Sequence, residues 1–133
     1  MSKDFQPKQF LGYLMAMAIK GVSGRLLENF KEAGFNITRA HWLIMAKTFH
    51  FSSDNFLQSE AVEMMMGDKT SVTRAVDDLV KRGWLTREID EQDRRNRVLK
   101  LTELGEEKVP LMMKSVHKTM NEMTDGIETE NLQ

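Results

Sequence analysis

Apolar residues recur every three or four positions along five stretches of the chain, which is the spacing of an amphipathic helix. The predicted helices cover residues 8–33, 38–49, 59–66, 69–82 and 103–123. Between the last two helices, residues 84–89 and 97–102 are rich in β-branched and large side chains, which predicts a β-hairpin. The expected fold is therefore mainly α with a small β-hairpin, an α+β class.

The third and fourth predicted helices are separated by a very short break. Gly67 and Asp68 form this break, and Asp68 is the predicted N-cap of the fourth helix, which ends at Gly83. Two helices joined by a short turn that contains glycine have the geometry of a helix-turn-helix. Residues 59–82 are therefore predicted to form that motif.

The fourth predicted helix has two chemically different faces. The apolar face, expected to be buried, consists of Val72, Ala75, Val76, Leu79 and Val80. The exposed N-terminal part carries short hydroxyl and basic side chains, namely Lys69, Thr70, Ser71, Thr73 and Arg74. Such groups suit base edges and phosphates in a major groove, although capping of the first helical turn is the alternative role for the hydroxyls.

Two acids lie on the C-terminal half of the same helix. Asp77 and Asp78 are expected to form ion pairs with Arg74, Lys81 or an arginine of the hairpin. Hydrogen bonding to a cytosine amine is the second role considered for them.

The predicted hairpin has a basic tip. Arg94, Arg95, Arg97 and Lys100 lie within seven residues, with no acid among them. Alone, such a run is most often a solvated loop. Directly after a helix-turn-helix, it predicts a wing whose tip reaches phosphates or an adjacent narrow minor groove, where negative potential favours arginine. Asp93 is expected to bond to the backbone or to an arginine and so fix the shape of the loop.

Four segments in order resemble the MarR family of winged helix-turn-helix regulators over nearly the whole chain. They are "NITRAHWLIM", "QSEAVEMMM", "TSVTRAVDDLVKRGWLTR" and "DRRNRVLKLTELG". The resemblance implies a homodimer in which residues 8–34 and 103–133 form dimerisation helices and residues 36–102 form the DNA-binding domain. It also implies binding to a pseudo-palindromic site in double-stranded DNA, with release by a small anionic or aromatic effector held between the two parts. The crevice for this effector is expected to be lined by the first, second and last predicted helices.

The resemblance assigns roles to individual residues. Arg95 would enter the minor groove, and Thr70, Ser71, Thr73 and Arg74 would meet the major groove. Phosphate contacts are expected from Lys69, Arg82, Arg87, Arg94 and Arg97. Three departures from the family pattern are the acid at Asp78, a turn glycine displaced by about one residue, and the end of the chain at "GIETENLQ".

Composition narrows the classes of protein further. The sequence has no cysteine, which excludes disulfides and thiolate metal sites, and it lacks an apolar run long enough to cross a membrane. A cytoplasmic protein without a cofactor is expected. The net charge is only −1, but residues 68–100 carry nine lysines and arginines against seven acids, whereas residues 101–133 carry three against seven. The basic surplus therefore lies in the predicted DNA-binding half.

Three other classes of function are the alternatives to DNA binding. The chain has no nucleophile elbow, no phosphate-binding glycine loop and no paired-carboxylate pattern, so no enzyme is predicted and no catalytic residue is named. His41, His50 and His117 are far apart, and only folding would gather His41 and His117 into a metal-responsive crevice, so no metal ligands are assigned. A winged helix that binds protein instead of DNA is the remaining alternative.

Overall fold

The computed structural model describes residues 7–50 and 55–124, and it confirms a mainly α chain with a small β-hairpin. The elements are α1 (Pro7–Glu32), α2 (Arg39–His50), β1 (Phe56–Leu57), α3 (Gln58–Met64), α4 (Lys69–Lys81), β2 (Leu85–Ile89), β3 (Arg97–Leu101) and α5 (Glu103–Thr124). Every predicted helix is present. The loop predicted between the second and third helices falls largely on residues 51–54, which lie outside the described residues.

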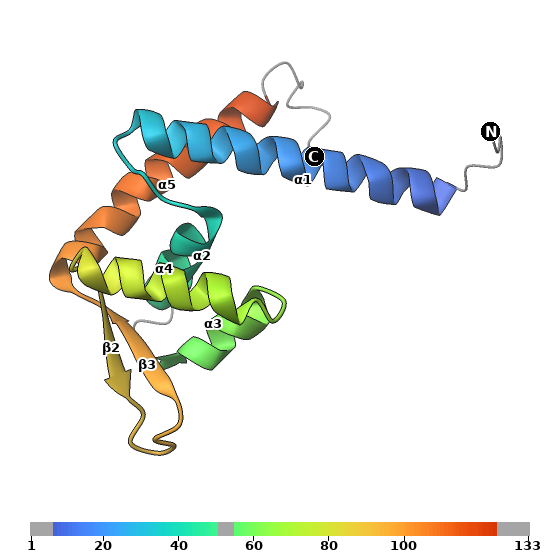
Figure 1. The fold of residues 1–133 in the computed structure, drawn as a ribbon. Coiled ribbons are helices and arrows are strands. Elements are labelled where there is room, and N and C mark those ends of the chain that lie inside the picture. The colour runs from blue at the N-terminus through green and yellow to red at the C-terminus, as the bar shows by residue number, and fades with distance from the viewer. Residues whose placement is uncertain (1–6, 51–54, 125–133) are drawn as a thin grey trace.

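The long helices and the small sheet lie at opposite ends of the molecule (Figure 1). Helices α1 and α5 run side by side at one end, and the N-terminal half of α1 extends beyond the other elements. The other end consists of α2, α3, α4 and an antiparallel sheet with the strand order β1-β3-β2. Strand β1 was not predicted, because two residues are too few to display the alternation of a strand.

One hydrophobic core joins the two ends. The largest fully buried apolar side chains come from α1, α2, α4, the hairpin and α5: Phe30, Ile44, Met45, Leu79, Leu85, Leu99 and Met112. The ring centroids of Phe30 and Trp42 lie 5.7 Å apart, which packs the end of α1 onto α2. The helix-turn-helix is therefore held by a core that includes both long helices.

The predicted N-cap of α4 is present, and the start of α2 is capped by a side chain as well. The Oδ1 atom of Asp68 accepts a hydrogen bond from the backbone N–H of Ser71 (3.0 Å), which begins α4. Gly67 has a φ of 84°, a left-handed conformation that glycine adopts without steric cost, and it turns the chain between α3 and α4. At the start of α2, the hydroxyl of Thr38 accepts a hydrogen bond from the backbone N–H of His41 (3.3 Å).

Two predicted apolar stripes differ from the observed ones. Val80 of α4 is exposed, although it was expected in the buried face. In the sequence, Leu104, Met112, Val116, Met120 and Met123 lie near one helical stripe and so predict the buried side of α5, but the buried residues of α5 are Gly105, Val109, Met112, Ser115 and Thr119. The spacing of apolar residues does not reveal this buried face, because small and hydroxyl side chains form much of it.

Polar contacts explain why hydroxyl side chains are buried between α1 and α5. The Nδ2 atom of buried Asn29 donates to the hydroxyl of Thr119 (2.8 Å), and that hydroxyl donates to the carbonyl of Ser115 (2.8 Å). Beside them, the guanidinium of Arg25 binds both carboxylate oxygens of Glu122 (2.6 and 3.1 Å). Buried polar groups need such partners, and these pairs set the register of the two helices.

The start of α5 is tied to the start of the hairpin. The hydroxyl of Thr102 accepts a hydrogen bond from the backbone N–H of Gly105 (3.0 Å) and so caps α5. The same hydroxyl donates to the carbonyl of Gly83 (2.6 Å), which follows α4 and precedes the hairpin. Gly105 lies against the carbonyl oxygen of Trp84, and a Cβ atom at this position would overlap that oxygen. A side chain therefore cannot be added at Gly105 without moving the backbone.

We expect Gly105→Ala to lower the free energy of unfolding by about 1–3 kcal/mol, because overpacking against backbone forces a shift of α5. Urea unfolding measures this change. The matched control is Gly21→Ala in α1, where the added Cβ would meet no atom within 4 Å. That control should be neutral or stabilising, since alanine favours helix. Equal effects of the two substitutions would contradict the close contact.

Candidate nucleic-acid interface

Helix α4 buries one face and exposes the polar part of its N-terminal half. Val72, Ala75, Val76 and Leu79 are buried, as predicted. On the outer side, Lys69, Thr70 and Arg74 are exposed, and Ser71 and Thr73 lie half-buried at the edges. The structure therefore brings the five predicted recognition residues to one accessible region, in the first half of a helix whose other face is fixed in the core.

The tip of the wing is shaped by Asp93. Its Oδ1 atom accepts hydrogen bonds from the backbone N–H and the Nε of Arg95 (3.2 and 3.0 Å), and its Oδ2 atom accepts from Nη2 of Arg95 (3.0 Å). These bonds lower the pKa of the Asp93 carboxyl, which remains ionised. The predicted contacts of Asp93 with backbone and arginine are both present. Together they fix the direction of the Arg95 side chain.

Arg95 and Arg94 project from this tip. The side chain of Arg95 is 90% exposed even though it is paired with Asp93. The side chain of Arg94 is 71% exposed, and its nearest carboxylate, that of Glu91, is 3.7 Å away. Ion pairs this exposed contribute little to stability, so both guanidinium groups are available to an anionic partner.

Arg97 occupies a different place in the wing. Its Nη1 atom donates to the carbonyl oxygens of Arg94 (3.0 Å) and Asn96 (3.2 Å). From the first residue of β3, the guanidinium thus holds the backbone of the turn at the wing tip. The sequence predicts only a phosphate contact for Arg97 and does not indicate this bond to the backbone.

The two other arginines expected to meet phosphate have partners within the chain. Nη1 of Arg87 in β2 lies 2.6 Å from Oδ1 of Asp77 in α4, which confirms the expected ion pair between this acid and a wing arginine. Nε of Arg82 lies 2.7 Å from Oδ2 of Asp78, and Nη2 of Arg82 donates to the carbonyl of Asn36 (2.7 Å). A phosphate contact by either arginine would have to share or replace these bonds.

His41 is the residue that sequence reasoning missed at this site. Its Nε2 atom lies 2.8 Å from Oδ2 of Asp78, and its Nδ1 atom accepts from the backbone N–H of Thr38 (3.0 Å). Because Nδ1 is an acceptor, the proton lies on Nε2 and is donated to Asp78. Asp78 therefore pairs with Arg82 and His41 instead of Arg74 or Lys81. The three-residue spacing from Thr38 to His41 is that of a capping box, and this was the available clue.

The described part of the chain contains no candidate metal site and no candidate membrane span. Within residues 7–50 and 55–124, no three or more His, Cys, Asp or Glu side chains are grouped so that they could hold a metal ion. His41 instead faces Asp78. None of the described helices combines the length and the apolar character that a membrane crossing requires.

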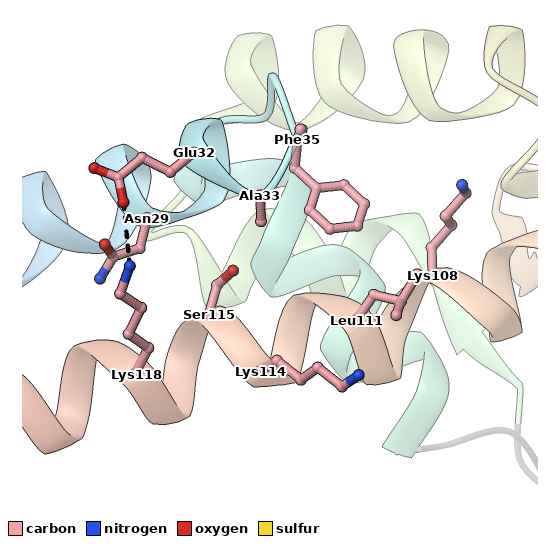
Figure 2. Close-up of a pocket in the computed structure, with 10 residues that line it drawn as sticks. Asn29, Glu32, Ala33, Phe35, Lys108, Leu111, Lys114, Ser115 and Lys118 are labelled. Carbon is pink, nitrogen blue, oxygen red and sulfur yellow. Dashed lines mark hydrogen bonds and ion pairs between the residues drawn. The ribbon is translucent and has the colours of Figure 1, made fainter.

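A crevice of about 470 Å³ lies away from the wing, between the end of α1 and α5 (Figure 2). Its lining residues are Asn29, Glu32, Ala33, Gly34, Phe35, Lys108, Leu111, Lys114, Ser115 and Lys118. Three of them are lysines, and Lys118 is paired with Glu32 (3.1 Å). The effector crevice had been expected between the first, second and last helices. The observed lining comes from α1, the segment after it and α5, with none from α2.

Taken together, α3, α4 and the hairpin β2–β3 define a winged helix-turn-helix protein. Residues 53–96, which contain α3, α4 and the tip of the hairpin, match the family model "MarR family". This part of the chain is therefore similar to the MarR family, and the resemblance seen in the sequence is confirmed.

Relatives and solved structures agree with this assignment. The chain is 29% identical over 132 residues to the transcriptional repressor MprA of Escherichia coli strain K12, covering 96% of this chain and 72% of MprA. A MarR-family transcriptional regulator from Rhodococcus sp. RHA1 has the same fold, with a TM-score of 0.83, 19% identity and coverage of 98% and 89% of the two chains. CouR from Rhodococcus jostii RHA1, solved bound to p-coumaroyl-CoA, gives a TM-score of 0.77 at 18% identity, with 92% and 83% covered.

The His41–Asp78 contact predicts a pH dependence of stability. Burial lowers the pKa of His41 below its ordinary value of 6.5, and the nearby Asp78 carboxylate opposes this shift. The folded state therefore binds fewer protons than the unfolded chain, so this stabilisation is complete above pH 6.5 and is lost as the pH falls through the folded pKa. The lowered pKa of Asp78 acts in a separate window, below its ordinary value of 3.8.

We expect the free energy of unfolding to fall more steeply between pH 7 and pH 5 in the unmodified protein than in His41→Gln. Glutamine can donate to Asp78 and accept from Thr38 but does not titrate. Urea unfolding at a series of pH values measures both curves. Parallel curves would show that His41 is not the group that titrates in this window.

Proposed function

We propose that this protein is a transcriptional repressor that binds double-stranded DNA as a homodimer and has no enzymatic activity. The observation that carries the proposal is the pre-shaped arginine tip of the wing, which follows directly after the polar, exposed start of α4. The repressor MprA, which is similar over nearly the whole chain, supports the same function.

The proposed contacts divide into two kinds. Thr70, Ser71, Thr73 and Arg74 read base edges in a major groove, and Arg95 enters the neighbouring minor groove. Phosphate contacts are proposed for Lys69, Arg94 and Arg97 and, through exchange of their internal carboxylate partners, for Arg82 and Arg87. Phosphate contacts supply affinity and orientation, whereas base contacts supply sequence preference.

An unpartnered apolar stripe on α1 supports the proposed homodimer. Leu11, Met15 and Ile19 are spaced by four residues, share one helical face and are 58%, 54% and 56% exposed. They lie on the half of α1 that extends beyond the other elements in Figure 1. We propose that residues 8–34 and 103–133 form the dimer interface and that residues 36–102 bind DNA, with half-sites about 34–36 Å apart.

The crevice in Figure 2 is the proposed effector site. Lys108, Lys114 and Lys118 favour an anionic compound, while Phe35 and Leu111 provide apolar surface. CouR, with the same fold, was solved bound to p-coumaroyl-CoA. Such a ligand lowers DNA affinity if it binds more tightly to a dimer whose recognition helices are wrongly placed for DNA. The decrease is set by the ratio of its affinities for that arrangement and for the DNA-binding arrangement.

Arg95→Ala tests the DNA-binding proposal. We expect it to weaken binding to the preferred site by about 1–3 kcal/mol and to relax sequence preference. Arg94→Ala is the matched control at the next position. It should weaken all sequences similarly and make the salt dependence shallower by about one unit. Fluorescence anisotropy with labelled duplexes over a range of salt concentrations measures both. Unchanged affinity of Arg95→Ala would show that the wing does not contribute to DNA binding. No duplex binding by the unmodified protein at any salt concentration would favour a winged helix that binds protein.

Ile19→Glu tests the proposed dimer. Burial of an isoleucine contributes roughly 1.5–3 kcal/mol per protomer, and a carboxylate in its place opposes association. We expect sedimentation velocity to show a shift from dimer to monomer. Lys20→Glu, an exposed position one residue further on, should remain dimeric. A variant Ile19→Glu that stays dimeric at micromolar concentration would place the interface elsewhere.

A further inference from the structure

We propose that Met66, in the turn between α3 and α4, is a further specificity-determining residue, which contacts the 5-methyl group of a thymine in the major groove of duplex DNA. The inference rests on the proposed function and deepens it, because it names one base group that the helix-turn-helix reads. The contact adds an apolar element to the polar recognition residues of α4.

Met66 exposes almost its whole side chain. Its fractional exposure is 97%, whereas the next most exposed large hydrophobic residue of the described chain, Leu11, is at 58%. The residue before it, Met65, packs against the core, and the residue after it is a glycine. The Met66 side chain therefore gains almost nothing from folding, and its apolar surface can still be buried against a partner.

The backbone of Met66 has a conformation that disfavours methionine. Its φ is 57°, and no other non-glycine residue in the described part of the chain has a positive φ. This left-handed conformation is unfavourable for a residue with a Cβ atom, whereas glycine adopts it freely. The turn is also the one whose glycine is displaced by about one residue from the MarR-family pattern. Backbone strain clusters at functional sites, so methionine instead of glycine at this position indicates a role for its side chain.

Hydrogen bonds hold the turn in one shape. The backbone N–H of Met66 donates to the carbonyl of Glu63 (3.0 Å), and that of Gly67 donates to the carbonyl of Val62 (2.8 Å). The carboxylate of Asp68 then caps α4. The direction in which the Met66 side chain leaves the backbone is therefore fixed relative to the first turn of the recognition helix.

Met66 lies beside the recognition residues and away from the wing. It precedes the N-cap Asp68 by two residues, and the exposed side chains of Lys69 and Thr70 follow. Figure 1 shows this turn at the end of α4 farthest from the hairpin, and the 13 residues of α4 span about 20 Å. In helix-turn-helix proteins the N-terminal residues of this helix contact base edges. We therefore expect the Met66 contact on the side of each half-site that is farther from the contact of Arg95.

The methyl group of thymine is the base group whose chemistry matches Met66. The other groups that bases present in the major groove are hydrogen-bond donors and acceptors, whereas the C5-methyl of thymine is apolar and is contacted by apolar side chains. Methionine is flexible and polarisable, which suits contact with a small apolar group. Thr70 and Thr73 also carry methyl groups, so the experiment has to separate their contacts from that of Met66.

Replacement of thymine by deoxyuridine tests the contact, because it removes only the methyl group and retains base pairing. The duplex is the preferred site obtained by selection from a random library, and each of its thymines is replaced in turn. Fluorescence anisotropy gives the dissociation constant. We expect replacement of one thymine in each half-site to weaken binding by the unmodified protein roughly fourfold, as expected for the loss of one buried group of this size.

Three substitutions at position 66 separate an apolar contact from other effects. Met66→Leu keeps an apolar side chain and should keep the sensitivity to deoxyuridine. Met66→Gln keeps the length of the side chain, and Met66→Gly relieves the left-handed strain, but both should bind the thymine and deoxyuridine duplexes equally at that position. Urea unfolding should show Met66→Gly to be at least as stable as the unmodified protein, so its loss of discrimination would not result from unfolding.

The outcomes distinguish this contact from the proposed function. Tight duplex binding that no deoxyuridine replacement weakens would overturn the contact while leaving DNA binding intact. A methyl effect that persists in both Met66→Gln and Met66→Gly would also overturn it, and would assign the thymine to Thr70 or Thr73. Absence of duplex binding by the folded, unmodified protein would contradict both the proposed function and the contact, and would favour a protein partner.

Discussion

The carboxylate of Asp78 is the contact on which the placement of the recognition helix depends. Its Oδ2 atom accepts hydrogen bonds from His41 of α2 and Arg82 at the end of α4. The apolar face of α4 fixes which side points inward, but nonpolar packing is not directional. The hydrogen bonds of Asp78 are directional and therefore fix how the end of α4 is oriented against α2. The hairpin begins directly after Arg82 and Gly83, so its position depends on the same contact. Loss of one partner would leave the carboxylate paired with the other, and because the Asp78 side chain is 40% exposed, the main consequence would be loss of direction and not of much stability.

Hydrophobic periodicity and capping residues predicted the five helices with boundaries within two residues of those observed, together with the hairpin. Local chemistry decides these features. Contacts between distant segments could not be predicted in the same way. Asp78 looked like a departure from the family pattern, because its partner His41 lies 37 residues away. The buried side of α5 was misjudged for a similar reason, since its Thr119 is buried by a bond to Asn29 of α1. The exposure of Arg95 could be predicted from its place in a polar turn. The hydrogen bonds of Arg97 to backbone carbonyls depend on the folded shape of that turn and could not.

The region that matches the family model and the rest of the chain contain different proposed sites. Residues 53–96 contain α3, α4 and the wing tip, the elements proposed to bind DNA. The crevice is lined by residues of the ranges 29–35 and 108–118, which lie outside that match. The two parts meet where the ring of Phe35 packs edge to face against Trp84 of the matched region, with centroids 6.2 Å apart. The elements proposed to read DNA and the crevice proposed to bind an effector therefore lie in different parts of the chain.

The most direct test of the central claim is selection from a random duplex DNA library with the purified protein at physiological salt, followed by sequencing. The account predicts enrichment of a two-fold symmetric motif whose half-sites are about one helical turn apart. Its loss in Arg95→Ala would assign part of the motif to the wing. Failure of the folded, dimeric protein to enrich any motif would contradict the conclusion that this winged helix reads DNA.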